Sequence, residues 1–266
     1  MARSALLNVM VGAALKAGRT LARDLGEVEN LQVSVKGPGD FVSAADRRSE
    51  KIIIEELRKA RPTYSFLTEE TGEIPGDESS NRWLVDPLDG TTNFLHGIPI
   101  FSISIGLERN GELIAGVVYN PIMNELYAAE KGSGAFFNDR RRLRVAGRSE
   151  LKEAVIATGI PHLGRPAQDE FIKELDFLMR RVAGVRRCGS AALDLCWVAA
   201  GRFDGFWEHG LSPWDVAAGI VILREAGGIV TDGDGGLEVL TGKSIVAANS
   251  RLHPLLRAAL SGKQPA

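Results

Sequence analysis

The stretch Trp83-Leu84-Val85-Asp86-Pro87-Leu88-Asp89-Gly90-Thr91-Thr92-Asn93 runs from an apolar segment into two aspartates and a glycine. Its apolar start predicts a buried strand, so Asp86 and Asp89 would stand at the edge of a sheet, where ligands can reach them. If a helix begins near Gly90, its unpaired amides and the positive end of its dipole face the same point. Carboxylates attract cations and amides attract phosphate, so the combination favours a metal–phosphate complex.

A plainer interpretation of these residues needs no ligand. In it, Asp89 caps a helix and Asp86 closes a turn, as aspartates commonly do. Two aspartates before a glycine are weak evidence by themselves, so the surrounding sequence must decide between the two interpretations.

Further carboxylates occur at similar junctions between strands and helices. Glu69 and Glu70 follow a strand-like segment, and Asp215 and Asp46 lie near the starts of helical patterns. Taken singly, the adjacent glutamates form a solvated charge pair and Asp215 is an N-cap. Asp46 and Lys36 would each be ordinary surface residues. Their occurrence together favours a shared site.

The first half of the chain predicts helices and an antiparallel sheet. Apolar residues recur at helical spacing through residues 6–25, although the basic, acid-free first 23 residues superficially resemble a transit peptide. A second helical pattern covers Ala44–Ala60, with Ser43 as its N-cap. Asn110-Gly111 supplies a hairpin turn. The expected strands are Ser65–Thr68, Trp83–Val85, Phe101–Leu107, Leu113–Tyr119 and Glu125–Ala129.

The pattern changes near Gly147, where strands and helices begin to alternate. This alternation predicts a layered α/β unit. The expected strands are Ala154–Thr158, Phe203–Glu208, Ile229–Thr231 and Ser244–Ala248, and the expected helices are Gln168–Val182, Ala191–Ala200 and Trp214–Ala226. We therefore divide the chain into a first unit of residues 1–146 and a second unit of residues 147–266.

The composition gives no global attraction to a charged partner. The 266 residues include 32 basic and 34 acidic residues, a net charge of −2, which favours neither nucleic acid nor an anionic membrane. No apolar run is long enough to span a membrane. The two cysteines, Cys188 and Cys196, are too few for a disulfide framework or a zinc cluster, so a cytoplasmic location is expected.

Two glycine-containing segments imitate known motifs and fail on spacing. Thr241–Ser244 ends like a phosphate-binding P-loop, but Leu237 stands where the P-loop requires a glycine, and a strand pattern follows. Asp232–Gly236 resembles the start of a calcium loop, but its closing glutamate would fall at Lys243. We expect neither ATP nor calcium at these segments.

Several ordered motifs at matching separations resemble the inositol monophosphatase family, particularly its bacterial members, over nearly the whole chain. The stretches that carry the resemblance are Asp40–Asp46, Thr68–Gly72, Trp83–Phe94, Gly189–Asp194, Phe206–Gly210 and Pro213–Gly219. The resemblance implies an α/β (α+β) fold, a layered α-β-α-β-α sandwich. Residues 1–146 would carry most metal ligands, and residues 147–266 would carry Asp215 and the substrate contacts. It also implies hydrolysis of myo-inositol 1-phosphate and related small phosphate monoesters.

By the same resemblance, the cofactor is Mg²⁺, with two ions and a weaker third. Glu69, Asp86 and the backbone carbonyl of Leu88 would hold the first ion. Asp86, Asp89 and Asp215 would hold the second, and Glu69 with waters would support the third. Mg²⁺ prefers hard oxygen ligands, so a carboxylate cluster without histidine or cysteine suits it. Two such ions, about 3.5–4 Å apart, can stabilise both the attacking and the leaving oxygen.

The resemblance also assigns catalytic roles. Glu69 and a Thr91–Asp46 pair would orient and deprotonate the attacking water, without a covalent phosphoenzyme. The amides of Gly90 and Thr91 would hold phosphate oxygens. Lys36 matches a family lysine near the entrance, and a mobile surface lysine is the competing interpretation.

Substrate contacts are a separate inference from the resemblance. Glu208 would accept hydrogen bonds from hydroxyls of the inositol ring, because a carboxylate can take two hydroxyl hydrogens. Ala191 and Asp89 would line the ring. Without the resemblance, an exposed charge at a strand end explains Glu208 equally well.

Two other functions stay open. A phosphatase of the same fold acting on fructose 1,6-bisphosphate, histidinol phosphate or a 3′-phosphoadenosine nucleotide would need basic residues near the pocket, and the sequence cannot place Arg165, Arg186 or Arg187. A role in a complex of the RNA polymerase type, as for some bacterial relatives, could use the basic run of Arg140–Arg142 with Arg144 and Arg148, although a solvated loop is the simpler explanation. The family also implies lithium inhibition and a homodimer.

Overall fold

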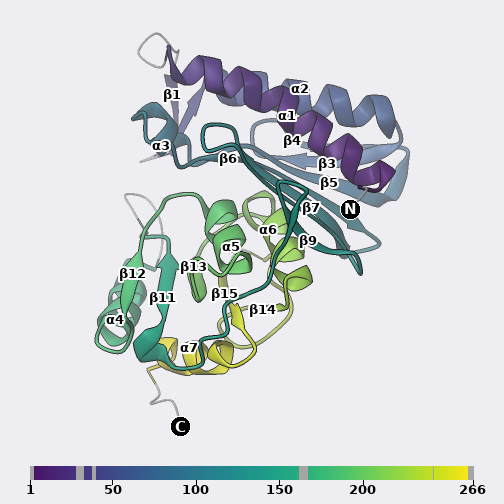
Figure 1. The fold of residues 1–266 in the computed structure, drawn as a ribbon. Helices are drawn as coiled ribbons and strands as arrows, with labels where there is room; N and C mark the ends of the chain where they lie inside the picture. Colours follow the sequence, from purple (N-terminus) through teal and green to yellow (C-terminus); the bar gives the residue numbers. More distant parts are fainter. Residues whose placement is uncertain (1–2, 28–32, 38–39, 162–166, 242, 263–266) are drawn as a thin grey trace.

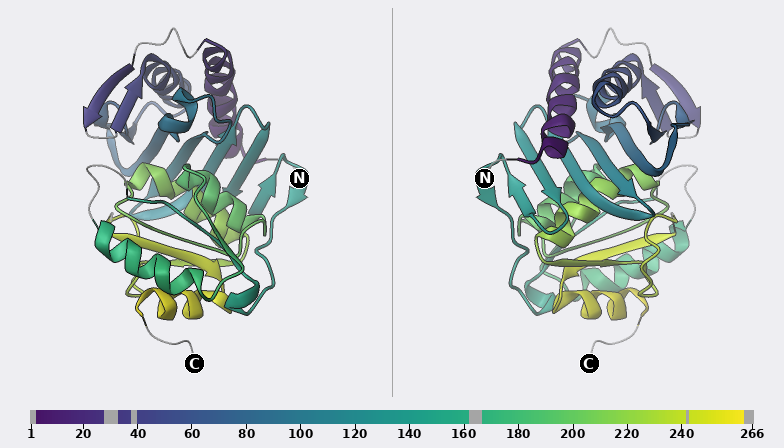
Figure 2. Two further views of the ribbon diagram at one scale, coloured as in Figure 1. Left: turned by 90° about the vertical axis from the view of Figure 1, so that its left-hand side faces the viewer. Right: turned by 90° about the vertical axis from the view of Figure 1, so that its right-hand side faces the viewer.

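Five layers alternate helices with sheets in the computed structural model (Figures 1 and 2). The structure describes residues 3–27, 33–37, 40–161, 167–241 and 243–262, with the side chains of 33–37, 40–42 and 79 outside the description. The outer helices α1 (Ala5–Leu25) and α2 (Ala44–Ala60) cover one face of an eight-stranded sheet. Its other face packs on the central helices, a five-stranded sheet follows, and two further helices close the stack. The predicted α-β-α-β-α sandwich is therefore confirmed.

The eight-stranded sheet has the strand order β10-β9-β8-β7-β6-β5-β3-β4. The strands are β3 (Tyr64–Thr68), β4 (Gly72–Ile74), β5 (Glu78–Asp89), β6 (Ser102–Arg109), β7 (Glu112–Asn120), β8 (Glu125–Glu130), β9 (Gly134–Phe137) and β10 (Arg141–Arg142). The sheet was expected to be antiparallel, but β3 and β5 pair in parallel. The reason is that β4 returns the chain along β3, so that β5 starts at the same edge as β3. A separate pair, β1 (Val33–Gly37) and β2 (Asp40–Ser43), precedes α2.

The five-stranded sheet has the order β12-β11-β13-β15-β14. Its strands are β11 (Val155–Thr158), β12 (Gly184–Arg186), β13 (Gly205–His209), β14 (Gly228–Thr231) and β15 (Ser244–Asn249). The remaining helices are α3 (Thr91–Leu95), α4 (Gln168–Met179), α5 (Ala191–Ala199), α6 (Pro213–Glu225) and α7 (Leu252–Leu260), with a short 3₁₀ turn, η2, at Leu151–Glu153. Helices α5 and α6 lie between the two sheets, and α4 and α7 lie on the outer face (Figure 1).

The helix α6 approaches the first sheet closely because two strands present glycine to it. A Cβ atom on Gly116 of β7 would lie 2.4 Å from the carbonyl oxygen of Ala218, and one on Gly106 of β6 would lie 2.8 Å from the Cβ of Ala217. No side chain fits at either glycine unless the helix moves away. This contact fixes the start of α6, and with it Asp215, against the sheet that carries Asp86.

The predicted hairpin and first helices are confirmed. Asn110 and Gly111 both have positive φ, 52° and 78°, as a tight turn between β6 and β7 requires. Ser43 caps α2 by accepting a hydrogen bond from the backbone N–H of Ala45 at 3.1 Å. Among the described residues, none of the helices is long and apolar enough to cross a membrane.

Several expected boundaries were wrong. The helix expected at Gln168–Val182 ends at Met179, and the strand expected at Trp83–Val85 extends from Glu78 to Asp89. Arg141–Arg142 was expected in a solvated loop, but it forms the edge strand β10, since it pairs with β9. The arginines of the basic run are nevertheless exposed, as predicted.

Candidate active site

The parallel pairing of β3 and β5 brings Glu69 beside Asp86. Thr68 pairs with Val85, and the backbone N–H of Glu69 donates to the carbonyl of Val85 at 3.2 Å. The residues after this pair, Glu69 and Asp86, are therefore neighbours at the same sheet edge. Asp86 is buried and Glu69 is half-buried.

A break in the register of β5 between Asp86 and Asp89 forms the turn before α3. The Asp86 carboxylate closes this turn, because its Oδ1 accepts from the backbone N–H of Leu88 at 2.9 Å. The carbonyl of Leu88 accepts from the Thr91 hydroxyl at 3.1 Å. Gly90, with φ of 95°, precedes α3. The expected helix start at Gly90 is thus confirmed, although α3 has only five residues.

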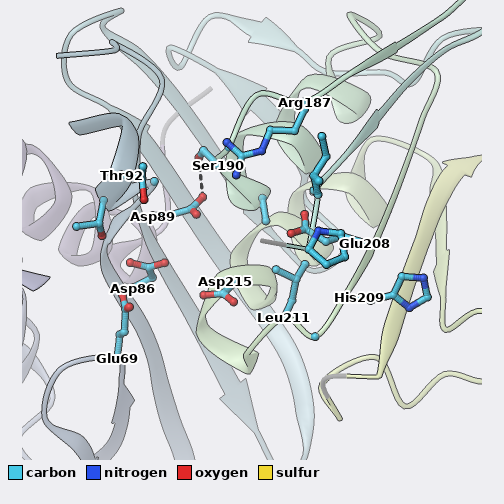
Figure 3. A pocket seen from close by; sticks show the side chains of 18 of the residues that line it. Glu69, Asp86, Asp89, Thr92, Arg187, Ser190, Glu208, His209, Leu211 and Asp215 are labelled. Atoms are coloured by element: carbon cyan, nitrogen blue, oxygen red, sulfur yellow. Dashed lines mark hydrogen bonds between the residues drawn. The ribbon is translucent and has the colours of Figure 1, made fainter. Parts of the chain in front are cut away.

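Asp89 caps a helix, but a distant one. Its Oδ2 accepts from the Ser190 hydroxyl at 2.6 Å and from the backbone N–H of Ala192 at 2.9 Å, in the first turn of α5 (Figure 3). Ser190 is buried, and its hydroxyl also lies 3.3 Å from that of Ser102 on β6. Asp89 therefore joins the first half of the chain to the second.

Asp215 lies in the first turn of α6 and is not its N-cap as expected, because Ser212 occupies that position and Asp215 completes a capping box with it. Its Oδ2 accepts from the backbone N–H of Ser212 at 2.7 Å. Asp86, Asp89 and Asp215 thus share one arrangement, in which a backbone amide holds one carboxylate oxygen and the other oxygen remains for a ligand. The capping interpretation and the ligand interpretation are compatible, because they use different oxygens.

The electrostatics of these carboxylates are unfavourable without a cation. Burial, followed by repulsion from Glu69, Asp89 and Asp215, raises the pKa of Asp86 well above its ordinary value. Burial raises the pKa of Asp89 to about 6, although hydrogen bonds from Ser190 and from the backbone at the start of α5 lower it. Burial and then repulsion from Asp89 raise the pKa of Asp215. The group is one that a metal ion would stabilise.

Thr91 connects the pocket to the buried Asp46. The Thr91 hydroxyl lies 3.1 Å from Oδ1 of Asp46, and Oδ2 of Asp46 accepts from the N–H and the hydroxyl of Ser43 at 2.8 and 2.6 Å. Burial raises the pKa of Asp46. Asp46 is therefore not a surface residue.

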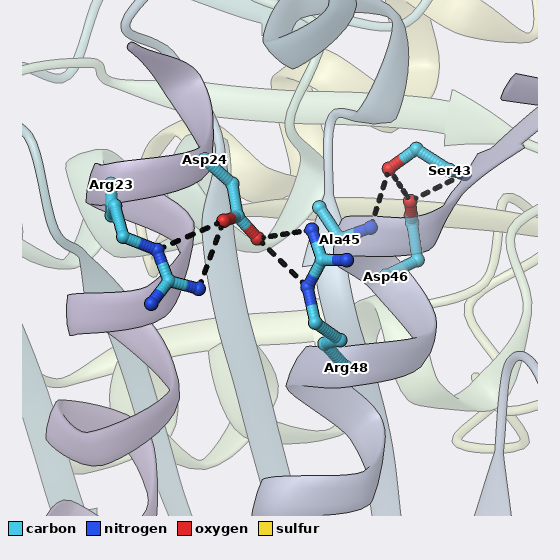
Figure 4. A network of polar contacts seen from close by, with 6 residues as sticks. All are labelled: Arg23, Asp24, Ser43, Ala45, Asp46 and Arg48. Carbon is cyan, nitrogen blue, oxygen red and sulfur yellow. Dashed lines mark hydrogen bonds and ion pairs between the residues drawn. The ribbon is translucent and has the colours of Figure 1, made fainter. Parts of the chain in front are cut away.

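The start of α2, where Asp46 lies, is tied to the end of α1 through Asp24 (Figure 4). Asp24 is buried, and its carboxylate accepts from Arg23 of its own helix and from Arg48 of α2, the latter at 2.7 Å. This ion-pair bridge fixes the first turn of α2 beside the pocket.

One pocket, of about 160 Å³, collects most of the predicted site residues (Figure 3). The predicted residues that line it are Glu69, Asp86, Leu88, Asp89, Gly90, Thr91, Ala191, Glu208 and Asp215. Asp46 lies behind Thr91, and the side chain of Lys36 lies outside the described residues. Within the described ranges, no three His, Cys, Asp or Glu side chains are already gathered as a metal site. The assigned roles remain predictions.

Glu208 of β13 lies on the side of the pocket away from Glu69 and Asp86 (Figure 3). Ala191 of α5 also lines the pocket. His209, the next residue, lies 2.8 Å through its Nε2 from Oε2 of Glu174, which raises the pKa of the imidazole. His209 also lines the pocket, and this contact holds its imidazole against α4, which carries Glu174.

Sequence reasoning gave no role to Ser190 and could not place Arg187, and both line the pocket. Ser190 stood within a quoted motif, but its contact with Asp89 spans 101 positions of the chain. Ser190 stands at the N-cap position of α5, so its local signal predicts a cap and not the contact with Asp89, and Arg187 has no local signal.

The fold and the pocket define a phosphatase of known type: the chain belongs to the inositol monophosphatase family, whose model matches residues 2–264. The chain is 64% identical, over 96% of both chains, to a protein of Mesorhizobium japonicum named inositol-1-monophosphatase. It is 45% identical to the Nus factor SuhB of Pasteurella multocida, over 93% of this chain and 92% of that one. The crystal structure of extragenic suppressor protein suhB from Bartonella henselae superposes with a TM-score of 0.94 at 60% identity, covering 97% and 98% of the chains.

Proposed function

We propose that this chain is a Mg²⁺-dependent phosphomonoesterase that hydrolyses myo-inositol 1-phosphate and related small phosphate monoesters. The observation that carries the proposal is the set of three aspartates, each with one oxygen held by a backbone amide, around a pocket that Glu69 and the turn at Gly90 also line. The name of the Mesorhizobium relative supports the substrate.

The residues of the pocket fit Mg²⁺ by their chemistry. Glu69, Asp86 and the carbonyl of Leu88 would hold one ion, and Asp86, Asp89 and Asp215 a second, with a weaker third near Glu69. All of these donors are hard oxygen atoms. Burial, together with repulsion from neighbouring carboxylates, raises the pKa of Asp86, Asp89 and Asp215, so their charged forms are costly without a cation. When bound, the ions would supply positive charge to the phosphate oxygens and acidify water in the site.

The chain's own residues would orient the reactants. The backbone amides of Gly90 and Thr91 would hold phosphate oxygens at the turn before α3. The Thr91 hydroxyl has one hydrogen, and when this is donated to Asp46, the oxygen of Thr91 can accept a hydrogen bond from water. Asp46 and Glu69 are the acceptors for the proton that this water releases. We propose Lys36 as a contact near the entrance.

The test is a pair of substitutions, Asp89→Asn and Asp215→Asn. Asparagine keeps an oxygen that can accept the backbone hydrogen bonds but removes the charge, so we expect each variant to fold and to lose nearly all Mg²⁺-dependent release of phosphate from inositol 1-phosphate. Circular dichroism checks the fold. Asp176→Asn, on the exposed face of α4, is the control. Activity retained by either pocket variant would disprove the metal assignment.

We further propose that Glu208 and Ala191 contact the ring of the substrate. A Glu208→Gln variant should raise KM for inositol 1-phosphate more than for a monoester without ring hydroxyls. Lithium inhibition, a homodimer and a cytoplasmic location are proposed on the family resemblance alone. Inhibition assays, light scattering and fractionation test them.

A second candidate function is supported by the name Nus factor SuhB of the Pasteurella relative and by the exposed arginines 140–142 and 144. We propose that this basic edge can contact a transcription complex. Asp89→Asn would silence the chemistry in a pull-down with RNA polymerase components, and reversal of the charges at 140–142 should abolish any capture. If capture survives that reversal, this edge is not the contact.

A further inference from the structure

Arg187 is the one arginine or lysine among the described residues that line the pocket. Its side chain is exposed and, among the described residues, forms no hydrogen bond or ion pair, whereas most of the other charged groups of the pocket are carboxylates. The remaining basic residue, His209, is engaged by Glu174. A single unpaired cation in an acidic pocket is a binding group for an anion.

The loop that carries Arg187 is fixed to the metal side of the pocket at two points. Asn93 of α3 donates to the carbonyl of Cys188 at 2.8 Å, and Ser190 donates to Asp89 at 2.6 Å. Both ties lie within three residues of Arg187. The base of its side chain therefore has a set position relative to Asp89, although the guanidinium reaches the solvent.

The course of the side chain depends on Gly189, which has φ of 88°. A Cβ atom at this position would lie 2.6 Å from Nη1 of Arg187 and 3.0 Å from Nδ2 of Asn93. The guanidinium therefore packs directly over the backbone of Gly189 and extends toward Ser190 and the pocket (Figure 3). Any other residue at 189 would displace it.

The pocket thus has two regions of different chemistry. Glu69 and Asp86 lie on one side, Glu208 lies on the opposite side, and the guanidinium of Arg187 lies between them beside Ser190 (Figure 3). The hydrolysed phosphate belongs with the carboxylates and their metal ions under the proposed function. A group near Arg187 would instead belong to the alcohol part of the substrate.

We propose that Arg187 forms a subsite for a second acidic group, a phosphate or a carboxylate, on the alcohol part of the substrate. The proposal rests on the proposed phosphatase function and extends its substrate class beyond neutral polyol monophosphates. Without Arg187, the negative charge of such a group would be repelled by the carboxylate of Glu208. With Arg187, the guanidinium can bind it through two parallel hydrogen bonds.

Two matched substrate pairs test the proposal, each differing by one acidic group. They are fructose 1-phosphate with fructose 1,6-bisphosphate, and glycerol 2-phosphate with 2-phosphoglycerate. Phosphate release is measured for the unaltered enzyme and for Arg187→Gln, which removes the charge at similar length. We expect Arg187→Gln to lower kcat/KM about tenfold or more for the member with the extra acidic group, mainly through KM, and less than about threefold for its partner.

Two further variants sharpen this comparison. Arg187→Lys keeps the positive charge but lacks the paired N–H donors of the guanidinium. It should retain part of the preference for the substrate with the extra acidic group. Arg180→Gln removes the same charge from the exposed C-terminal end of α4 and should leave kcat/KM unchanged for both members of each pair. A selective loss confined to one pair identifies phosphate or carboxylate as the bound group.

An equal loss for both members of each pair would place Arg187 on the hydrolysed phosphate and overturn the subsite. An absence of any loss would also overturn it. Failure of the proposed function is distinguishable, because the unaltered enzyme would then not hydrolyse inositol 1-phosphate in Mg²⁺ at all.

Discussion

In the aspartates of the pocket, one carboxylate oxygen accepts a backbone hydrogen bond and the other is available to a ligand. In Asp86, Asp89 and Asp215, a backbone amide occupies one oxygen and so fixes the direction of the other. A side chain held in this way loses little entropy when a ligand binds. For the same reason, a cap visible in the sequence does not argue against a ligand.

Ser190 is predicted to support metal binding through Asp89. Ser190→Ala removes the 2.6 Å hydrogen bond but leaves the N–H of Ala192 in place, so we expect the Mg²⁺ concentration for half-maximal activity to rise about tenfold, as loss of a ligand's partner typically causes. Titration of activity with Mg²⁺ measures it. Ser190→Thr should restore it, and Ser102→Ala, which removes the neighbouring hydroxyl, should have little effect. Equal effects of the two alanine variants would contradict this role.

The raised pKa values predict opposite effects of pH on the stability of the metal-free protein and on metal binding. The folded protein binds protons at Asp89, Asp86 and Asp215 more tightly than the unfolded chain does. The stability that Asp89 contributes is therefore fully present below its ordinary pKa of 3.8 and is lost as the pH rises through about 6. The contributions of Asp86 and Asp215 change in the same direction. Mg²⁺ must displace the same protons, so its affinity should increase over this range.

Thermal unfolding in a chelator and Mg²⁺ titration by calorimetry, at pH 5 to 7.5, measure the two trends. Asp89→Asn should flatten the decrease of the melting temperature. The assignment fails if the variant and the unaltered protein have the same pH slope.

At the scale of elements, the bridge between α1 and α2 has a measurable role. Asp24→Ala removes a carboxylate that is 4% exposed and accepts from Arg23 and Arg48, so we expect a loss of about 1–3 kcal/mol in the free energy of unfolding. Urea unfolding measures it. Asp176→Ala breaks the exposed pair with Arg180 and should cost about 0.5 kcal/mol or less. Equal costs would show that burial of Asp24 adds nothing.

Elements with local signals were predictable from the sequence. The cap at Ser43 and the turn at Asn110-Gly111 act within a few residues, and both were found. The strand β12 was not predicted, because its three residues are held only by pairing with β11. Helix α7 was not predicted either; it has Pro254 in its first turn, and its N-cap residue, Arg251, makes no capping hydrogen bond with its side chain.

The residues of the candidate site could be predicted from the sequence, but the contacts that bring them together could not. The motif residues around Asp86 and Asp215 could be assigned by resemblance, and they do line one pocket. The parallel pairing that brings Glu69 to Asp86 and the tie from Asp89 to Ser190 depend on the folded chain, since each joins residues without local contact. The position of Arg187 depends on the same tie.

For the whole molecule, we propose that residues 1–146 and 147–266 act as two units joined through the pocket. Core residues of both form one apolar cluster, in which Leu84 and Val118 pack with α5 and α6. Asp89 and Asp215 come from different units but share the proposed ion. Metal binding should therefore strengthen the contact between the units.

We expect Mg²⁺ at about one hundred times its dissociation constant to stabilise the protein by about 2.7 kcal/mol, which is about 5–10 °C in melting temperature at this size. Scanning calorimetry with and without a chelator measures the shift. Asp215→Asn should abolish most of it while the protein still unfolds cooperatively. A full shift in that variant would mean that the ion does not bridge the units.

The two glycines that face α6 have a consequence for random mutagenesis. Gly106 and Gly116 do not line the pocket, yet any larger residue there forces α6 from the sheet and moves Asp215 with it. A library screened for lost phosphatase activity should therefore yield changes at Gly106 and Gly116 as readily as at Asp215. The melting temperature of each hit, measured in a chelator, would distinguish the two kinds of variant. Without Mg²⁺, substitutions at Gly106 and Gly116 should lower the melting temperature and those at Asp215 should not.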